Sequence, residues 1–555
     1  MTRRTILLRG LAGLGITGLG GLIAACQQPT RPPRPSDATP IPARPTIQPT
    51  ATLTRAAPDG KPSAQVTPTP GPPKPGGAIV WATDRDPLDL DPHTAASTRG
   101  ADAWAGLVYQ SLVMFDENMR LMPALAEAWV MSDPTTWSFK LRQGVTFHDG
   151  TELEAEDVRY WFERLRATET ASPYRDWYRR VVKVEPQGRY EVVFTLSAPY
   201  APLLAVLASL RGSAIAPRKW LSSSRTDTKL TAVGSGPYKL AEYVPRSHVR
   251  YLRHREYWER SLPYLDEVTL QIVPDEQARL DGLRAGQFSA TAVSPEAARR
   301  LRSDPALVVR SSAGVSQMVT WLNTRRPPFD DVRVRRAIAL AADRPAVLKQ
   351  AGLGAGQLTG PLPTGLAGWA LPPESLPYTR DLEQARQLLA EAGHPDGFEA
   401  TIKAATDASP GPAIAQQFAG QLGEIGINLK VEQVTAAELA AAITAKQFEA
   451  CVSRVEHLPD PDQYCTLLYH TAGSQNATSW SSRAFDDLVD SARGIMDPGQ
   501  RKALYDQAAG ILLDEAPAIW WFTEQTHLAL ARDVRGYTSA ISGRRAALKR
   551  TWLDR

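Results

Sequence analysis

Cysteine and histidine are scarce in this chain, with 3 and 8 copies among 555 residues. The histidines are scattered and show no metal-ligand spacing, so we predict no metal and no cofactor. A long apolar segment is also missing. The uncharged residues 10–25 are only sixteen in number and rich in glycine, too short and too poor in helix formers to span a membrane. A polytopic membrane protein is therefore excluded.

Common catalytic motifs are absent as well. The sequence has no HExxH, no GxSxG and no Walker A pattern, which removes the familiar signatures of zinc proteases, serine hydrolases and nucleotide hydrolases. A glycosidase with two paired carboxylates stays open, because its acids need no fixed sequence spacing. We therefore expect a protein that is not an enzyme, with a secreted hydrolase kept as the alternative.

The main part of the chain has no large excess of positive or of negative charge. Residues 1–75 hold nine basic and two acidic residues, whereas residues 76–555 hold 54 basic and 57 acidic ones. The excess of positive charge thus comes from the amino-terminal end. A body this close to neutrality lacks the basic surface of a nucleic-acid-binding protein.

The amino terminus is ordered like a secretory signal, with the basic head MTRRTILLRG before the apolar stretch. Ile23-Ala24-Ala25-Cys26 resembles the lipobox at which bacterial lipoproteins are cleaved. The resemblance implies a signal peptide at residues 1–25 and lipidation of Cys26, with enough acyl chains to anchor the protein on the outer face of the cell membrane. In a cell with two membranes this is the periplasmic side. An ordinary signal stays open, as does the choice between the general and twin-arginine export routes.

A proline-rich segment follows. Residues 27–75 contain 15 prolines and hardly any large apolar side chain. Such a segment cannot bury enough surface to offset its chain entropy, so we expect residues 26–75, with the lipidated cysteine at their start, to be an extended, disordered tether. If Cys26 is lipidated, Cys451 and Cys465 remain. Their spacing permits a disulfide without establishing it.

From residue 76 onward, strand-like and helix-like patterns alternate, which is typical of an α/β protein. Apolar side chains alternate with polar ones at 137–142, indicating a strand, and residues 154–166 carry an apolar stripe at helical spacing. Asp381 and Gly393 bracket another predicted helix as its amino-terminal cap and its stop.

Six segments resemble the motifs of one family. They are LMPALAEAW at 121–129, WSFKLRQGVTFHDGTELEAEDV at 137–158, GSGPYKL at 234–240, YWERSLPYLDEVTLQIVPD at 257–275, LNTRRPPFDDVRVRRAIALAADR at 322–344 and ARQLLAEAGHPDGF at 385–398. In this order they resemble the family 5 extracellular solute-binding proteins, the peptide- and nickel-binding receptors of ABC importers. The resemblance spans roughly residues 76–540.

The resemblance implies an α/β fold like the type II periplasmic binding proteins, with an extra domain, three lobes and a ligand cleft closed by a hinge. The implied boundaries are residues 76–113, 225–312 and 518–555 for lobe I, 114–224 for lobe II, and 313–517 for lobe III. It also implies a monomeric substrate-binding lipoprotein that captures an oligopeptide, an oligosaccharide or a related small solute and delivers it to an ABC permease. A solute sensor or chaperone on the same fold stays open.

The resemblance also places candidate ligand contacts. They are Tyr109, Trp321, Asn323, Arg454, Glu456, His457 and Trp480. In peptide binders of the family, an aspartate in the segment that corresponds to residues 454–462 holds the peptide's ammonium group. In this chain His457 takes the position of that aspartate, and Glu456 precedes it. An imidazole does not supply the same charge complement, so either Glu456 substitutes or the ligand lacks an amine. A core role stays open for the three aromatic residues. Arg454 is the best candidate to hold a ligand anion, and an intramolecular ion pair with Glu456 or Asp460 stays open for it.

Two further groups of residues indicate a scaffold role. Gly234 and Gly236 suit a tight crossing between lobes, where the backbone must approach another segment closely. Arg333, Arg335, Arg336 and Arg344 lie on a predicted helix that begins near Asp331 and carries an apolar stripe, which favours a solvated face for the arginines. An anion site stays open as the alternative.

Overall fold

The computed structural model describes residues 71–555 except 88, 95–98, 224–226, 367, 378, 408, 457 and 541–544. The described residues belong to one compact unit. The predicted signal peptide, Cys26 and most of the tether lie outside the described residues. Within the described residues, no helix is both long enough and apolar enough to cross a membrane.

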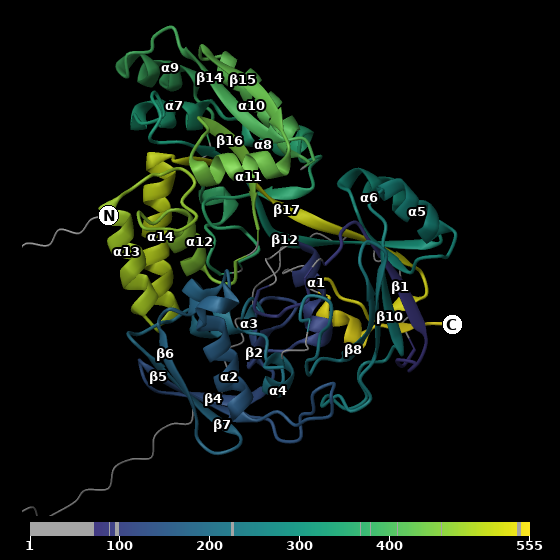
Figure 1. Ribbon diagram of the computed structural model, residues 1–555. Coiled ribbons are helices and arrows are strands. Elements are labelled where there is room, and N and C mark those ends of the chain that lie inside the picture. Colours follow the sequence, from purple (N-terminus) through teal and green to yellow (C-terminus); the bar gives the residue numbers. More distant parts are fainter. Residues whose placement is uncertain are drawn as a thin grey trace, which may run out of the picture. The chain divides into compact units, whose positions relative to one another are not determined.

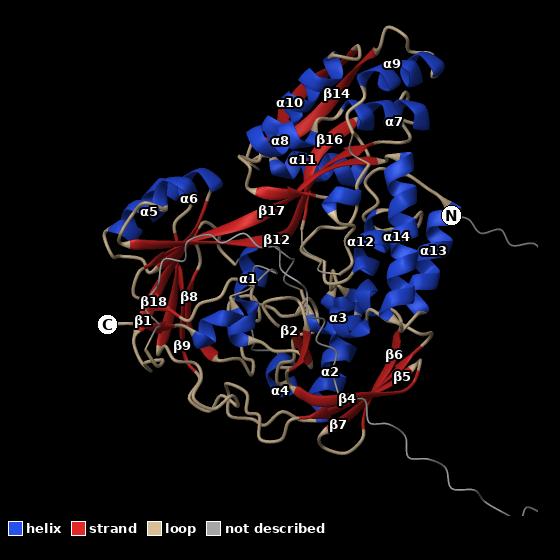
Figure 2. Ribbon diagram, turned by 180° about the vertical axis from the view of Figure 1, so that it is seen from behind, coloured by secondary structure: helices blue, strands red, loops and turns tan. Residues whose placement is uncertain are grey.

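An eleven-stranded mixed sheet forms the centre of the fold (Figures 1 and 2). Two long antiparallel strands, β12 (Leu307–Leu322) and β17 (Ala518–Ala531), run through it and pair from Leu307↔Ala531 to Trp321↔Ala518. The first half-sheet lies beyond β17 and contains β11 (Ala290–Val293), β1 (Ala78–Thr83), β10 (Glu267–Ile272), β9 (His248–Arg253) and β8 (Tyr238–Val244). The second lies beyond β12 and contains β16 (Ala450–Val455), β14 (Phe398–Ala405) and β15 (Ile427–Val434), while β13 (Gly356–Leu358) pairs with β17.

Each half-sheet has parallel strands connected through helices. β1 pairs in parallel with β10 and β11, and β14 pairs in parallel with β15 and β16. Parallel strands need long crossover connections, which are supplied here by α5 (Glu276–Arg284), α10 (Gly411–Gly423) and α11 (Ala436–Ala445). The long antiparallel strands therefore join two parallel units that are each covered by helices.

A second, antiparallel sheet is built from residues 126–196. Its order is β4 (Ala126–Asp133), β5 (Thr136–Leu141), β7 (Glu191–Leu196) and β6 (Val181–Pro186). Helix α2 (Ala155–Arg166) packs on it through Val158, Trp161, Phe162 and Leu165, which are all buried. The predicted strand at 137–142 and helix at 154–166 are confirmed.

The remaining elements surround these sheets. They are α1 (Arg99–Val108), β2 (Val113–Phe115), β3 (Leu121–Pro123), α3 (Leu203–Ala208), α4 (Arg218–Leu221), α6 (Pro295–Leu301), α7 (Val332–Ala341), α8 (Arg344–Gln350), α9 (Leu382–Glu391), α12 (Pro461–Leu468), α13 (Arg483–Gly494), α14 (Pro498–Glu515), β18 (Val534–Arg535), β19 (Trp552–Leu553) and the short 3₁₀ helices Thr168–Thr170, Arg175–Tyr178, Pro373–Ser375 and Ala546–Arg550. The predicted cap of α9 is present, because the Asp381 side chain accepts a hydrogen bond from the Gln384 N–H.

One apolar core joins the antiparallel sheet to helices α12–α14, since Trp161 and Phe194 belong to the same buried cluster as Tyr464 and Leu512. A separate core lies between the second half-sheet and α7–α10, and another lies beside the first half-sheet. Polar contacts accompany the first of these cores, because the Gln463 Nε2 donates to the Tyr200 hydroxyl at 3.1 Å. The three lobe boundaries given above stay a prediction.

The four arginines were wrongly expected to lie on one solvated helix face, because Arg344 begins a second helix, α8, and two of the four side chains are buried. Arg335 and Arg344 are only 4% and 3% exposed, and their guanidinium groups donate to backbone carbonyls. The acceptors are Phe329, Asp330 and Glu515 for Arg335, and Ala339 and Trp520 for Arg344. These two side chains therefore fix the ends of neighbouring elements, whereas Arg333 and Arg336 form ion pairs at the surface.

The other two scaffold questions have clear answers. A Cβ atom on Gly234 would lie 2.1 Å from the Val108 oxygen, so the expected close approach of backbone to backbone is present. Cys451 and Cys465 are both buried free thiols, so the disulfide that the spacing permitted does not form.

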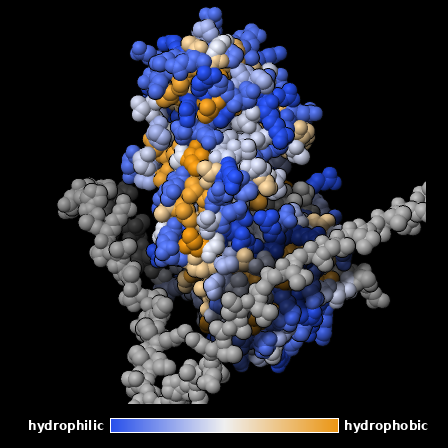
Figure 3. Space-filling view, turned by 90° about the vertical axis from the view of Figure 1, so that its left-hand side faces the viewer, coloured by the Kyte–Doolittle hydropathy of each residue, from blue (hydrophilic) through white to orange (hydrophobic). Residues whose placement is uncertain are grey.

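The face seen in Figure 3 is mainly hydrophilic, with hydrophobic residues gathered in a narrow band.

Candidate ligand-binding site

A cavity of about 600 Å³ lies beside the two long strands and is lined by both half-sheets. The first half-sheet lines the cavity with residues 81–85 at the end of β1 and with the beginnings of α5 and α6. The second half-sheet lines it with Ser409, Arg454 and Glu456. The crossing strands contribute residues 314–316 and 524–527. Small-molecule sites in proteins have volumes of about 300–1,000 Å³, so the cavity is of ligand-binding size.

An ion pair lies in the cavity wall on the side of the second half-sheet. The Arg454 guanidinium donates to both Glu524 carboxylate oxygens, with Nε–Oε2 at 2.5 Å and Nη2–Oε1 at 2.9 Å. Its Nη2 also donates to the Ser409 carbonyl at 2.7 Å. Arg454 is thus compensated by the protein itself, in the bidentate geometry that suits guanidinium and carboxylate groups.

Carboxylates also face the cavity. The Glu456 Oε2 accepts a hydrogen bond from the Ser316 hydroxyl at 3.3 Å. Across the cavity, the Glu276 Oε1 accepts from the Ser294 N–H at 2.6 Å, linking the beginnings of α5 and α6. The cavity wall therefore offers negative charge on both half-sheets.

An arginine and two tryptophans form a cluster in the cavity wall on the side of the first half-sheet. The Arg545 guanidinium carbon lies 4.6 Å from the Trp81 ring centre and 5.7 Å from that of Trp104. Its Nη1 donates to the Tyr537 hydroxyl at 2.9 Å. Cation–π contacts of this kind hold a guanidinium plane in a fixed orientation.

His527 and Arg279 contribute further polar groups to the cavity wall. Burial, followed by the charges of Arg302 and Arg299, lowers the pKa of His527, whose Nδ1 lies 2.7 Å from the Ser311 hydroxyl. Arg279 donates to the Thr291 hydroxyl and to the carbonyls of Val273 and Pro274. Among the described residues no group of three or more His, Cys, Asp or Glu side chains is placed to hold a metal ion.

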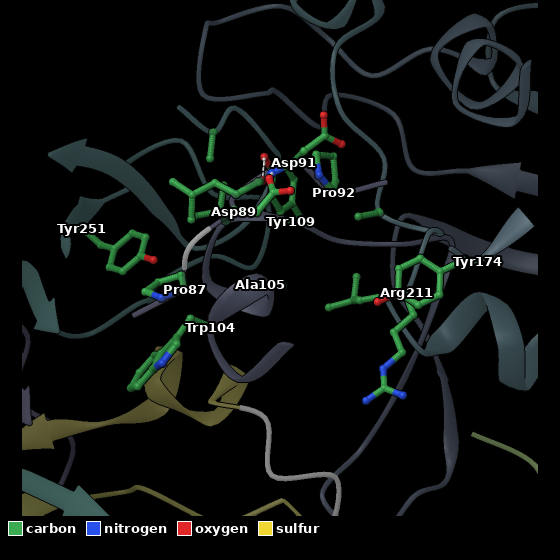
Figure 4. A pocket seen from close by; sticks show the side chains of 15 residues that line it. Pro87, Asp89, Asp91, Pro92, Trp104, Ala105, Tyr109, Tyr174, Arg211 and Tyr251 are labelled. Carbon is green, nitrogen blue, oxygen red and sulfur yellow. Dashed lines mark hydrogen bonds between the residues drawn. The ribbon is translucent and has the colours of Figure 1, made fainter. Parts of the chain in front are cut away.

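Two of the predicted contact residues, Arg454 and Glu456, line this cavity. His457 lies outside the described residues. Tyr109 lines a different and much smaller cavity, of about 50 Å³, whose walls include Pro87, Asp91 and Tyr251 (Figure 4). Its hydroxyl donates to the Leu90 carbonyl at 3.0 Å, and burial raises its pKa.

The other three predicted residues are packed within the second half of the fold. Trp321 is 3% exposed, with its ring 5.8 Å from that of Tyr469. Asn323 is 1% exposed and donates to the Phe448 carbonyl at 2.8 Å. Trp480 borders a separate polar cavity of about 630 Å³, and its Nε1 donates to the Glu515 carboxylate at 2.6 Å. None of the three lines the 600 Å³ cavity.

Sequence reasoning did not select Trp81, Glu276, Glu524 or Arg545. One of them had a visible signal, because residues 523–527 interrupt the apolar run of β17 with the polar sequence TEQTH. Polar residues within a buried strand indicate a site or an internal partner.

The comparisons with known proteins agree on one family. The model of the bacterial extracellular solute-binding proteins, family 5 Middle, matches residues 120–476. The chain belongs to this family. Di/tripeptide-binding protein 2 of Pseudomonas aeruginosa is 31% identical over 474 residues, covering 79% of this chain and 88% of that protein. Glutathione-binding protein GsiB of Escherichia coli K12 is 29% identical over 472 residues, covering 83% and 91%.

Solved structures of the family share the fold. The periplasmic binding protein DppA of Helicobacter pylori, in complex with the peptide STSA, has a TM-score of 0.74 at 26% identity, covering 87% of this chain and 99% of that one. HbpA2 of Haemophilus parasuis has a TM-score of 0.76 at 26% identity, covering 86% and 100%. The predicted type II periplasmic-binding-protein fold is confirmed.

Membership in this solute-binding family also fixes the general role. Its members are extracytoplasmic transport receptors that bind a solute for an ABC permease, and they are not enzymes. The hydrolase alternative is therefore dropped, and the protein is a substrate-binding component of an importer.

Proposed function

We propose that this solute-binding protein captures a short peptide or a peptide-like solute in the 600 Å³ cavity. The observation that carries the proposal is the mixed charge of the cavity wall, which combines the Glu276 and Glu456 carboxylates with arginine side chains. A zwitterionic ligand needs both signs of charge in one site. The names of two relatives, a di/tripeptide-binding and a glutathione-binding protein, support the same ligand class. An oligosaccharide is the less favoured ligand, because it carries no such charges.

Glu456 is our candidate for the ligand's ammonium group. It lines the cavity, and its Oε2 accepts a hydrogen bond from the neutral Ser316 hydroxyl at 3.3 Å. A carboxylate supplies the charge complement that an imidazole at position 457 does not. We therefore assign the role of the family's aspartate to Glu456.

Capture by hinge closure fits the connectivity. β12 and β17 pass from one half-sheet to the other and both contribute to the cavity. A ligand that contacts both half-sheets stabilises only the arrangement in which they are close, and so shifts the population toward it. The three lobes, with the boundaries 76–113, 225–312 and 518–555, then 114–224, then 313–517, are the moving parts in this proposal.

We further propose that Cys26 carries the lipid anchor, that residues 26–75 tether the body to the membrane, and that the protein acts as a monomer with its permease. The support is the lipobox-like sequence before Cys26 and the high proline content after it. Two acyl chains suffice for stable anchoring.

Calorimetric titration of the full chain with a panel of di- and tripeptides, followed by mass spectrometry of recovered ligand, tests the proposal. We expect one bound peptide, recovered intact, and a smaller radius of gyration by small-angle scattering when it is bound. Glu456→Gln is expected to weaken binding about tenfold or more, the cost of one lost charge-assisted hydrogen bond. Glu399→Gln, at an exposed strand position, is the matched control. Absence of binding by every peptide contradicts the ligand class.

A further inference from the structure

We propose that Arg545 is the anion-binding residue of the cavity and that the ligand carries a carboxylate which docks against its guanidinium. The inference rests on the proposed function, since it concerns the same cavity, and it narrows the ligand class to solutes with a free carboxylate. It assigns this role to the carboxyl-terminal end of the chain and not to Arg454.

The first support is burial without a counter-ion. Arg545 is 8% exposed, and the one polar partner of its guanidinium within the described residues is the Tyr537 hydroxyl. Its Nε is buried and has no hydrogen-bond partner there. No carboxylate of the described part of the chain lies within ion-pair distance of it. A buried charge is costly unless it is paired, so an unpaired one in a cavity wall points to a partner from outside.

The second support comes from how the chain treats its other buried arginines. Arg454 is paired with Glu524 in the wall of the same cavity, at 2.5 and 2.9 Å. Away from the cavity, Arg501 is paired with Asp460, and Arg493 with Asp462. The buried Arg279 and Arg335 have no carboxylate partner among the described residues, but each donates to at least two backbone carbonyls, as the buried Arg344 also does. Arg545 has neither arrangement, because its guanidinium donates only to the Tyr537 hydroxyl within the described part of the chain.

The third support is orientation. The rings of Trp81 and Trp104 lie 4.6 and 5.7 Å from the guanidinium carbon, and both tryptophans line the same cavity. Aromatic faces satisfy part of the charge without using any of the five N–H donors. The side chain therefore keeps donors for a carboxylate while the rings hold its plane, which is the preorganised fork that favours bidentate binding.

The stability of the ligand-free protein offers an independent readout. If the charge of Arg545 is compensated only when a ligand anion is bound, replacing this residue by an apolar side chain of similar length removes an uncompensated buried charge from the ligand-free protein. Arg545→Met is then expected to leave the melting temperature of the ligand-free protein unchanged or higher. A structural role, in which the cation stabilises the tryptophan cluster, predicts a lower melting temperature.

The binding test compares the tripeptide Ala-Ala-Ala with its carboxyl-terminal amide by calorimetry on the full chain. We expect the wild type to prefer the acid by about tenfold or more, as for a charge-assisted pair, and Arg545→Gln and Arg545→Met to bind acid and amide equally. Arg550→Gln makes the same change at an exposed site of the same segment and is expected to keep the preference. A wild type that does not distinguish acid from amide overturns the inference while the proposed function stands.

If neither Ala-Ala-Ala nor any other peptide of the panel binds, the proposed function fails, and the anion site is decided by thermal shift with acetate, succinate and citrate. A carboxylate that raises the melting temperature of the wild type but not of Arg545→Gln supports the site. The absence of any such difference overturns it. The two failures are thus separable.

Discussion

The guanidinium of Arg454 is bound at both ends of the Glu524 carboxylate, a residue seventy positions later in the chain. The two side chains come from neighbouring regions of β16 and β17, which flank β12, and they are 16% and 22% exposed. Both line the ligand cavity. The arginine that was the best sequence candidate for a ligand anion is therefore already neutralised by the protein.

Glu524→Gln is expected to lower the free energy of unfolding by about 1–3 kcal/mol, because it leaves the Arg454 charge partly buried without its partner. Urea unfolding of the ligand-free protein measures the loss. The double variant Arg454→Gln with Glu524→Gln is the control and is expected to recover part of it, since no unpaired charge remains. A double variant as unstable as the sum of both single variants contradicts the pairing.

A buried histidine makes stability depend on pH. His93 is 0% exposed; its Nδ1 lies 2.6 Å from the Arg164 Nη1 and its Nε2 lies 3.0 Å from the Ala214 carbonyl. Burial, and then the Arg164 charge, lower the pKa of His93 to about 4 from the ordinary 6.5, although Asp91 acts in the opposite direction. Between these two pKa values only the unfolded chain takes up the proton. The contribution of His93 to the free energy of unfolding is therefore fully present above pH 6.5 and is lost as the pH falls toward 4.

For this one group the free energy of unfolding is expected to fall by about 1.4 kcal/mol per pH unit inside that window. Urea unfolding from pH 7 to 4.5 measures the slope, and His93→Gln is expected to make it shallower by one proton. His394→Gln, at a partly exposed histidine, controls for the substitution itself. An unchanged slope in His93→Gln would show that this imidazole is protonated in the folded protein.

The backbone crossing at Gly236 is expected to tolerate no side chain. An added Cβ would lie 2.4 Å from the Leu107 oxygen and 2.6 Å from the Val108 carbonyl carbon. Gly236→Ala is therefore expected to cost about 3 kcal/mol of stability, measured by thermal or urea unfolding. Gly420→Ala, in α10 with nothing within 4 Å of the new Cβ, is expected to be neutral or to stabilise by up to about 1 kcal/mol. Equal effects at both sites would contradict the steric argument.

Cys26→Ala is expected to move the protein from the membrane fraction to the soluble fraction, because the acyl chains that hold it are lost. Fractionation of cells with immunoblotting, and the mass of the mature amino terminus, measure this outcome. Gln27→Ala leaves the cysteine in place and is expected to remain with the membrane. Continued membrane retention of the Cys26→Ala protein would remove the lipid-anchor proposal.

Local patterns in the sequence were reliable where local forces decide. The stripe at residues 154–166 became α2, and Asp381 caps α9 as its side-chain chemistry predicts. Both follow from interactions within one or two helical turns. Long-range packing was harder to foresee: the arginines on α7 and α8 looked alike in sequence, yet Arg335 is buried and Arg333 exposed, because the segments packed against them differ.

The candidate site was only partly predictable for the same reason. Sequence pointed to Arg454 and Glu456, which line the cavity, but also to Trp321, Asn323 and Trp480, which are packed elsewhere. A side chain's type shows what it is able to bind and says nothing of which distant segments meet it. The pairing of Arg454 with Glu524 is of this kind.

By itself, the sequence determined the α/β alternation, the export signal pattern and the resemblance to one receptor family, because each is written in residues close together along the chain. Only the tertiary structure decided which charges are neutralised internally and which, like that of Arg545 beside Trp81 and Trp104, remain for a ligand. Charge compensation acts through space over a few ångströms. It therefore depends on segments hundreds of residues apart that the sequence alone does not bring together.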